Sequence, residues 1–168
     1  MTASYTYFSK NISFSPNKCL ASVFNATSSP VVIKIYRVFV YNNNYTSVSG
    51  VLTNLEIRKL SAASGGTTIT AISNDSNNTL SAYVNCATNA TITPTDLYRR
   101  ILWSTDEPSG TMDSDAFECI RSVACVWSLG YGTSLIEPIT LNANEGFGII
   151  NTGASIGQCD INIEFTAA

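Results

Sequence analysis

The sequence predicts an all-β fold, an antiparallel β-sandwich in which two sheets face each other. Short runs rich in β-branched and aromatic residues recur along the 168 residues, clusters of turn-forming residues separate them, and no segment has the pattern of a long helix. We count eight to ten such runs, which suits an eight-stranded jelly roll with long loops and an extended N-terminal segment. A chain of this length is expected to fold as one domain with a sizeable core.

Residues 1–30 differ from the rest of the chain. Tyr5 and Tyr7 alternate with small polar residues, and Phe8 is out of step with them. The segment is either the first strand of the sandwich or an extended arm that adds to a neighbouring subunit, since β-augmentation needs only free backbone groups and alternating anchors. The single β-sandwich domain is then expected over residues 31–168.

The clearest strand is predicted over residues 31–41, VVIKIYRVFVY, where nearly every residue is β-branched or aromatic. A cluster of turn formers follows it. In residues 51–60, Leu55 and Ile57 alternate with polar neighbours such as Glu56, which favours a second strand.

The middle of the chain contains weaker signals. Residues 67–73 and 79–86 are β-type runs on either side of a turn at 74–78. Residues 97–103, LYRRILW, fit a strand, and they also fit a helix that begins after Pro94 with Thr93 or Thr95 as its cap.

Residues 104–118 are the most polar and acidic stretch, which predicts a long exposed loop with one helical turn over 113–119. Residues 123–132 predict a buried strand that ends in a glycine turn. Three short strands are expected after it, over 135–141, 146–150 and 158–166. In the last of them, four apolar residues alternate with polar ones, which is typical of a half-buried strand: Cys159, Ile161, Ile163 and Phe165.

Two close glycines, Gly146 and Gly148, raise the question of a phosphate-binding loop. A dinucleotide fingerprint needs a third glycine before a helix, and a P-loop needs a following Lys and Ser or Thr, and both are missing. We therefore predict a hairpin in which Ile139 and Leu141 belong to one strand, and Phe147 and Ile149 point inward from the next. Gly146 is expected to have a positive φ, and Gly148 to leave room for another backbone.

Charge argues against nucleic-acid binding. Charged residues make up 12% of the chain, the net charge is −3, and the one adjacent basic pair is Arg99-Arg100. The N-terminus does not resemble a signal peptide, and no apolar run reaches the ~18 residues of a membrane helix. We expect synthesis in a cytoplasm and no membrane partner.

The five cysteines show no CxxC spacing and are expected to be free thiols that act as small hydrophobes. A disulfide between Cys119 and Cys125 is an alternative that spacing alone does not decide.

The chain has no histidine, which removes the commonest general base and the histidine-dependent nucleophile and metal sites. A glycosidase needs only two carboxylates. Its candidates are Asp106, Glu107, Asp113, Asp115 and Glu118, with Trp103 or Trp127 as a sugar platform. A solvated loop is the simpler interpretation of those carboxylates. We therefore expect no enzymatic activity and assign no catalytic and no cofactor-binding residue.

A Ca²⁺ site over 113–118 or 74–77 would have oxygen ligands, but neither segment follows the EF-hand spacing. We therefore assign no metal ligand.

Aromatic residues are prominent, and in a β-sandwich most of them fill the core or anchor subunit contacts. A stripe of them on one face would instead bind carbohydrate. The residues considered are Tyr36, Tyr41, Tyr45, Tyr83, Tyr98, Trp103, Trp127 and Tyr131.

The order of KIYRVFVYNNNYTSVSGVLTNLEIRKLSA, LYRRILWSTDEP, EPITLNANEGFGIINTG and DINIEFT resembles small jelly-roll structural proteins of tailed bacteriophages. Among these, it is most similar to the auxiliary, or decoration, capsid proteins of crAss-like and related podovirus-type phages, over residues 31–165.

The resemblance implies a virion protein on the outer capsid surface, made in the host bacterial cytoplasm. It would be a homotrimer that contacts the major capsid protein, with no cofactor and no direct contact with nucleic acid. Tail, collar and fibre components share these properties, and the alternative function is a carbohydrate- or receptor-binding module of a tail or fibre.

Overall fold

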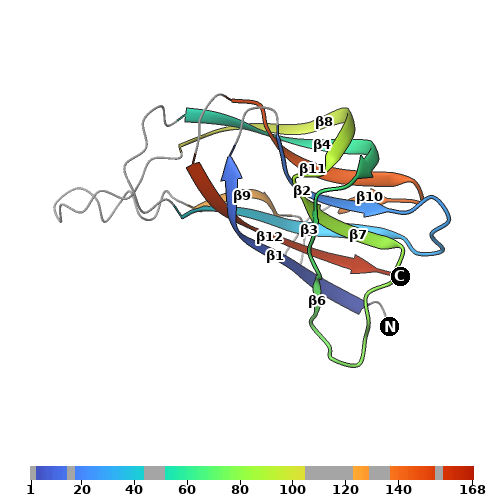
Figure 1. Ribbon diagram of the computed structural model, residues 1–168. Helices are drawn as coiled ribbons and strands as arrows, with labels where there is room; N and C mark the ends of the chain where they lie inside the picture. The colour runs from blue at the N-terminus through green and yellow to red at the C-terminus, as the bar shows by residue number, and fades with distance from the viewer. Residues whose placement is uncertain (1–2, 15–17, 44–51, 105–122, 129–136, 154–156) are drawn as a thin grey trace.

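The computed structural model describes residues 3–14, 18–43, 52–104, 123–128, 137–153 and 157–168. Every regular element in these ranges is a strand, and the strands form two antiparallel six-stranded sheets packed face to face (Figure 1). The predicted all-β sandwich is therefore confirmed. The described ranges contain twelve strands where the sequence predicted eight, because several of them are only two or three residues long.

Sheet A has the order β10-β3-β12-β1-β6, and β9 also pairs with β3. Its strands are β1 (Ala3–Phe14), β3 (Ile33–Asn42), β6 (Ile72–Ser73), β9 (Val123–Ser128), β10 (Ile139–Leu141) and β12 (Gly157–Ala167). Sheet B has the order β5-β7-β2-β11-β4-β8. Its strands are β2 (Lys18–Asn25), β4 (Leu52–Ser64), β5 (Thr67–Thr68), β7 (Val84–Thr88), β8 (Thr91–Ser104) and β11 (Glu145–Asn151).

The first thirty residues contribute one strand to each sheet. β1 lies between β12 and β6, and β2 lies between β7 and β11. The out-of-step aromatic pattern has a direct structural counterpart: Tyr5 and Tyr7 are buried in the core, whereas Phe8 is 46% exposed on the outer face.

The core lies between the inner faces of the two sheets. β12 shows how the sequence builds it, because its buried residues alternate with partly exposed ones along the whole strand. The four apolar residues predicted to face inward are all buried: Cys159, Ile161, Ile163 and Phe165. Strand β3 supplies Ile33, Ile35, Val38 and Val40 to the same core.

Two predictions for the middle of the chain need correction. Residues 97–103 belong to β8, so the helical alternative is wrong. Pro94 is tolerated because β8 is an edge strand, where a missing N–H need not break a ladder. The predicted strand over 67–73 is divided between β5 in sheet B and β6 in sheet A, so residues 69–71 cross between the sheets.

The predicted hairpin at Gly146 is wrong in its topology. β10 pairs with β3 in sheet A, whereas β11 pairs with β2 and β4 in sheet B. The turn over 142–144 therefore carries the chain from one sheet to the other. Phe147 and Ile149 point into the core as predicted.

The roles of the two glycines also differ from the prediction. The positive φ belongs to Asn144, at 63°. A Cβ on Gly146 would lie 2.5 Å from Cδ2 of Phe24, and one on Gly148 would lie 3.1 Å from Cδ1 of Leu60. Both glycines therefore make room for side chains of the same molecule.

Candidate functional site

Most of the residues that the sequence offered for chemistry lie outside the described part of the chain. This holds for the five carboxylates between 105 and 118, for the helical turn there and for Cys119. Trp103 lies in β8 opposite Thr53, and Trp127 lies in β9 opposite Val38, but the positions of their side chains are likewise outside the description.

In the candidate Ca²⁺ loop over 74–77, the carboxylate of Asp75 accepts hydrogen bonds from groups of the same turn. Asp75 Oδ1 accepts the backbone N–H of Asn77 at 3.0 Å, and Asp75 Oδ2 accepts Nδ2 of Asn78 at 2.9 Å. These contacts define an Asx turn. Within the described ranges, no group of three or more His, Cys, Asp or Glu side chains is placed to hold a metal ion.

The side chains of three of the five cysteines are described, and all three are buried free thiols, as predicted: Cys19, Cys86 and Cys159. Burial raises the pKa of Cys19 and of Cys86 to about 12. The thiolate is the nucleophilic form, so these groups are inert at neutral pH.

The described tyrosines from the candidate set do not fill the core. Tyr36 and Tyr41 are half-buried in β3, while Tyr83 and Tyr98 are exposed. The aromatic residues at the surface are therefore available for contacts with other molecules.

Several of them gather on the outer side of sheet A. Phe8 of β1, Asn162 of β12 and Phe39 of β3 are directly opposite one another in the sheet register. Tyr41 stacks on Phe39, with ring centroids 6.1 Å apart and ring planes 20° apart. We call this set, together with Asp160 beside Tyr41 in the register, the aromatic face.

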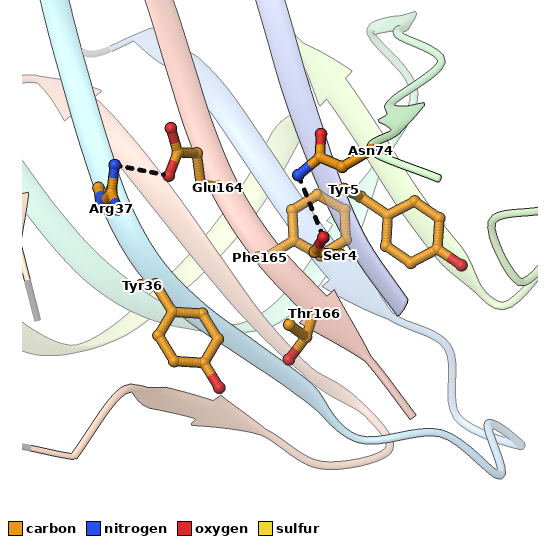
Figure 2. A pocket seen from close by; sticks show the side chains of 8 residues that line it. All are labelled: Ser4, Tyr5, Tyr36, Arg37, Asn74, Glu164, Phe165 and Thr166. Atoms are coloured by element: carbon orange, nitrogen blue, oxygen red, sulfur yellow. Dashed lines mark hydrogen bonds and ion pairs between the residues drawn. The ribbon is translucent and has the colours of Figure 1, made fainter. Parts of the chain in front are cut away.

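A shallow hollow of about 160 Å³ lies on the same side of the sandwich (Figure 2). Its lining includes Tyr36, Thr166 and the ion pair between Arg37 and Glu164, whose Nη1 and Oε2 are 3.2 Å apart. Arg37 and Glu164 lie two register rows from Asn162 and Phe39, beyond the buried pair of Ile163 and Val38, so the hollow continues the aromatic face.

The sequence shows Phe8 out of step with its aromatic neighbours, but neither Phe8 nor Phe39 is among the aromatic residues considered for binding. The signal was nevertheless present, because Phe39 and Tyr41 alternate with the buried Val38 and Val40 along one strand. In a strand whose buried residues are known, the residues between them point outward, and this rule identifies Phe39 and Tyr41 as surface aromatic residues.

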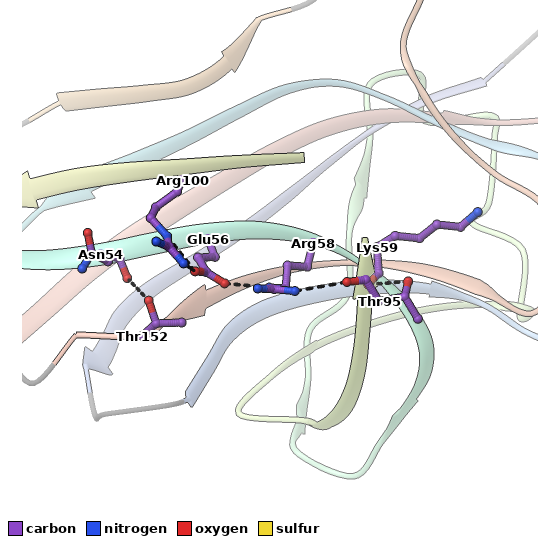
Figure 3. A network of polar contacts seen from close by, with 7 residues as sticks. All are labelled: Asn54, Glu56, Arg58, Lys59, Thr95, Arg100 and Thr152. Atoms are coloured by element: carbon purple, nitrogen blue, oxygen red, sulfur yellow. Dashed lines mark hydrogen bonds and ion pairs between the residues drawn. The ribbon is translucent and has the colours of Figure 1, made fainter. Parts of the chain in front are cut away.

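The outer side of sheet B has a different character. Glu56 of β4 is 2% exposed, and it accepts hydrogen bonds from Nε of Arg58 at 2.6 Å and from Nε of Arg100 at 2.8 Å (Figure 3). Arg58 also donates to the carbonyl oxygen of Thr95 at 3.1 Å. Burial alone would raise the pKa of Glu56 and is the largest single influence, but the bonds to Arg58 and Arg100 together lower it.

Strand β8 is the edge of sheet B next to this network. Among its residues 91–102, whose side chains are described, it exposes three large apolar or aromatic ones: Leu97 at 45%, Tyr98 at 37% and Leu102 at 65%. Leu97 and Leu102 lie opposite Arg58 and Asn54, on either side of Arg100. The result is an apolar strip with one guanidinium in its middle.

No helix in the described part of the chain is long and apolar enough to cross a membrane. No protein-family model matches the chain, and no curated protein and no solved structure is significantly similar to it.

Proposed function

We propose that the protein is a non-enzymatic structural subunit of a tailed-phage virion, an auxiliary capsid protein on the outside of the head that reinforces the shell through subunit contacts. Its partners are copies of itself, in a homotrimer, and the major capsid protein. The sequence resemblance suggests this role, and the edge of sheet B is the observation that carries it.

A long exposed edge strand is a template for pairing with another chain, and natural proteins protect such edges unless they use them. Three register irregularities interrupt the pairing of β8 with residues 57–62 of β4, but residues 99–104 of β8 pair regularly with β4. Leu97 and Leu102 are exposed on this strand. Tyr98 is exposed beside them, and tyrosine and arginine are enriched at the centre of protein interfaces.

The strand pairing also supports a jelly-roll connection. β1 pairs with β12, β2 with β11, and β3 with β10, so early strands pair with late strands in nested order. Nested antiparallel pairs arise when one long hairpin is folded over into two sheets, which is how a jelly roll is wound. We propose that topology for this chain.

The test is the oligomeric state of the purified chain, measured by light scattering during size-exclusion chromatography. Wild type is expected to form a trimer. Leu102→Asp places a charge in the apolar strip and is expected to weaken self-association at least about tenfold, since one desolvated charge removes more than 1.4 kcal/mol. Ile72→Asp is the matched control, because Ile72 is 67% exposed in β6 of the other sheet.

The biological side of the proposal is tested by mass spectrometry of purified virions, where the chain is expected in many copies per particle. A monomeric wild-type chain that is also missing from purified virions would contradict the proposed function.

A further inference from the structure

The outer side of sheet A has a surface whose chemistry is unrelated to the strip on β8. Phe8 exposes 46% of its surface on the long strand β1, where its neighbours Tyr7 and Ser9 are buried. Across the sheet, Phe39 and Tyr41 stand side by side as a stacked pair. Two aromatic platforms thus flank Asn162 on one sheet face.

Polar groups surround these platforms at fixed positions. Asp160 Oδ1 accepts the backbone N–H of Asn11 at 2.8 Å and Nδ2 of Asn43 at 2.6 Å. The side-chain oxygens of Asn43 and Asn162 are covered and find no donor among the described residues. A covered carbonyl without a donor is costly. Among the described residues, no hydrogen bond holds the Asn162 amide in place, so its carbonyl can turn outward to accept a ligand hydroxyl, which would remove that cost.

The hollow beyond Phe39 adds a second kind of contact. The ion pair between Arg37 and Glu164 presents donors and acceptors next to each other, and Tyr36 and Thr166 add hydroxyl groups (Figure 2). Adjacent donors and acceptors match neighbouring hydroxyl groups, each of which both donates and accepts. At about 160 Å³, the hollow suits a single ring at the end of a longer ligand.

The charges on this face point to an uncharged ligand. Along β12 and β3, the register rows of the aromatic face and the hollow hold two cationic side chains, Lys34 and Arg37, and two anionic ones, Asp160 and Glu164. Lys10 of β1, in the bulge opposite Asp160, adds one more positive charge, so the face is close to neutral. A surface that binds single-stranded nucleic acid also stacks bases on aromatic rings, but it needs an excess of positive charge. A balanced face does not supply that excess.

We propose that the outer face of sheet A binds a neutral carbohydrate chain. The apolar faces of the sugar rings lie on Phe8 and on the Phe39–Tyr41 pair, the amide of Asn162 bonds to a hydroxyl group, and the terminal ring enters the hollow. This activity goes beyond the subunit role and does not depend on it.

The experiment is affinity electrophoresis of the full chain in gels that contain a mannan, a xylan or a β-glucan, combined with a glycan array. Wild type is expected to bind at least one neutral glycan. Phe8→Ala, Phe39→Ala and Asn162→Ala are each expected to weaken that binding about tenfold, the effect of one lost aromatic or hydrogen-bonding contact.

Tyr83→Ala is the matched control, because Tyr83 is also aromatic and 42% exposed but lies just before β7 of the other sheet. It is expected to bind like wild type. Thermal unfolding midpoints verify that each variant is folded. Unchanged binding by folded Phe8→Ala, or binding to heparin or single-stranded DNA but to no neutral glycan, would overturn the proposal.

The two proposals fail separately. Leu102→Asp is expected to weaken self-association without changing the affinity of each chain for a monovalent oligosaccharide. Phe8→Ala is expected to weaken oligosaccharide binding without changing self-association. If the wild-type chain binds no neutral glycan, the carbohydrate proposal is wrong but the proposed subunit role is unaffected. If the wild-type chain is monomeric, the proposed trimer is wrong but the carbohydrate proposal is unaffected.

Discussion

The turn between β10 and β11 depends on the conformational freedom of a single residue. Asn144 has a φ of 63°, in the left-handed region that asparagine tolerates better than most residues other than glycine. Its side-chain oxygen accepts a hydrogen bond from the Thr27 hydroxyl at 3.1 Å, which ties the turn to the segment after β2. Glycine would also adopt this φ, but only the asparagine side chain can make the hydrogen bond to Thr27 that fixes the turn.

Replacing Asn144 tests this account. Asn144→Val is expected to destabilise the fold by about 1–3 kcal/mol, because a β-branched residue is strained at positive φ. Asn144→Gly is expected to change stability by less than about 1 kcal/mol, since relief of strain offsets the lost hydrogen bond. Urea unfolding measures both. Equal losses for the two variants would show that φ is not the deciding factor.

Glu56 shows how one buried carboxylate depends on its neighbours. It lies on the outer side of β4, yet it is almost completely covered and bound by two guanidinium groups. Removing either arginine leaves this covered carboxylate with only one guanidinium partner, which is destabilising, and removing both would leave a covered charge without a partner.

This arrangement makes stability depend on pH in acid. Since the pKa of Glu56 is lowered in the folded state, the unfolded chain binds the proton more readily. The stabilisation is complete above the ordinary pKa of about 4.5 and is lost as the pH falls through the lower folded value. Glu145 behaves in the same way, because its bond to Lys59 lowers its pKa.

Urea midpoints measured between pH 7 and pH 3 are expected to fall below about pH 4.5, the ordinary value for Glu56. Glu56→Gln should show a shallower fall, with the part due to Glu145 remaining. An NMR titration of wild type measures the Glu56 pKa without any variant. A titration at or above 4.5 would refute the network as described.

At the scale of elements, side chains on the outer side of sheet B pack across neighbouring strands. Gly146 of β11 lies opposite Phe24 of β2 and Leu60 of β4 in the register. The missing side chain lets the Phe24 ring lie over the β11 backbone. Glycine inside a strand often marks a site where another group comes close to the backbone, and at Gly146 that group is the Phe24 ring.

Gly146→Ala is expected to destabilise the protein by about 1–3 kcal/mol, since the new Cβ forces the Phe24 ring and Leu60 to move. In a Phe24→Ala background the same change should cost much less, and the double-mutant cycle measures this coupling. A coupling near zero would mean that the ring does not restrict Gly146.

Strand β8 shows that a local sequence pattern does not always determine secondary structure. Its sequence fits a helix and a strand equally well, and the pairing with β4 decides for the strand. The pairing also shows that Tyr98 lies at a register shift, between Leu97 opposite Arg58 and Arg99 opposite Ile57. Only the neighbouring strand reveals these features.

At the scale of the whole molecule, the two outer faces carry different chemistry on one shared core. Sheet A presents aromatic rings and balanced charges, and sheet B presents the Glu56 network and the leucines of β8. The core between them is continuous, so a substitution on one face need not disturb the other. This separation is what allows the assembly and carbohydrate proposals to be tested independently.

The sequence by itself determined the strand content and the inward faces of the strongest strands. β3 and β12 follow from β-branched composition and two-residue alternation, which depend only on local backbone geometry and the need to bury apolar side chains.

Tertiary structure alone decided which sheet each strand joins and which residues meet on the outer faces. The turn over 142–144 was expected to close a hairpin, but it connects the two sheets, because β11 finds its partners in β2 and β4. Likewise, Phe8 and Phe39 are thirty-one positions apart and meet across β12 through register alone. Pairing of distant strands is a long-range choice, and no local pattern encodes it.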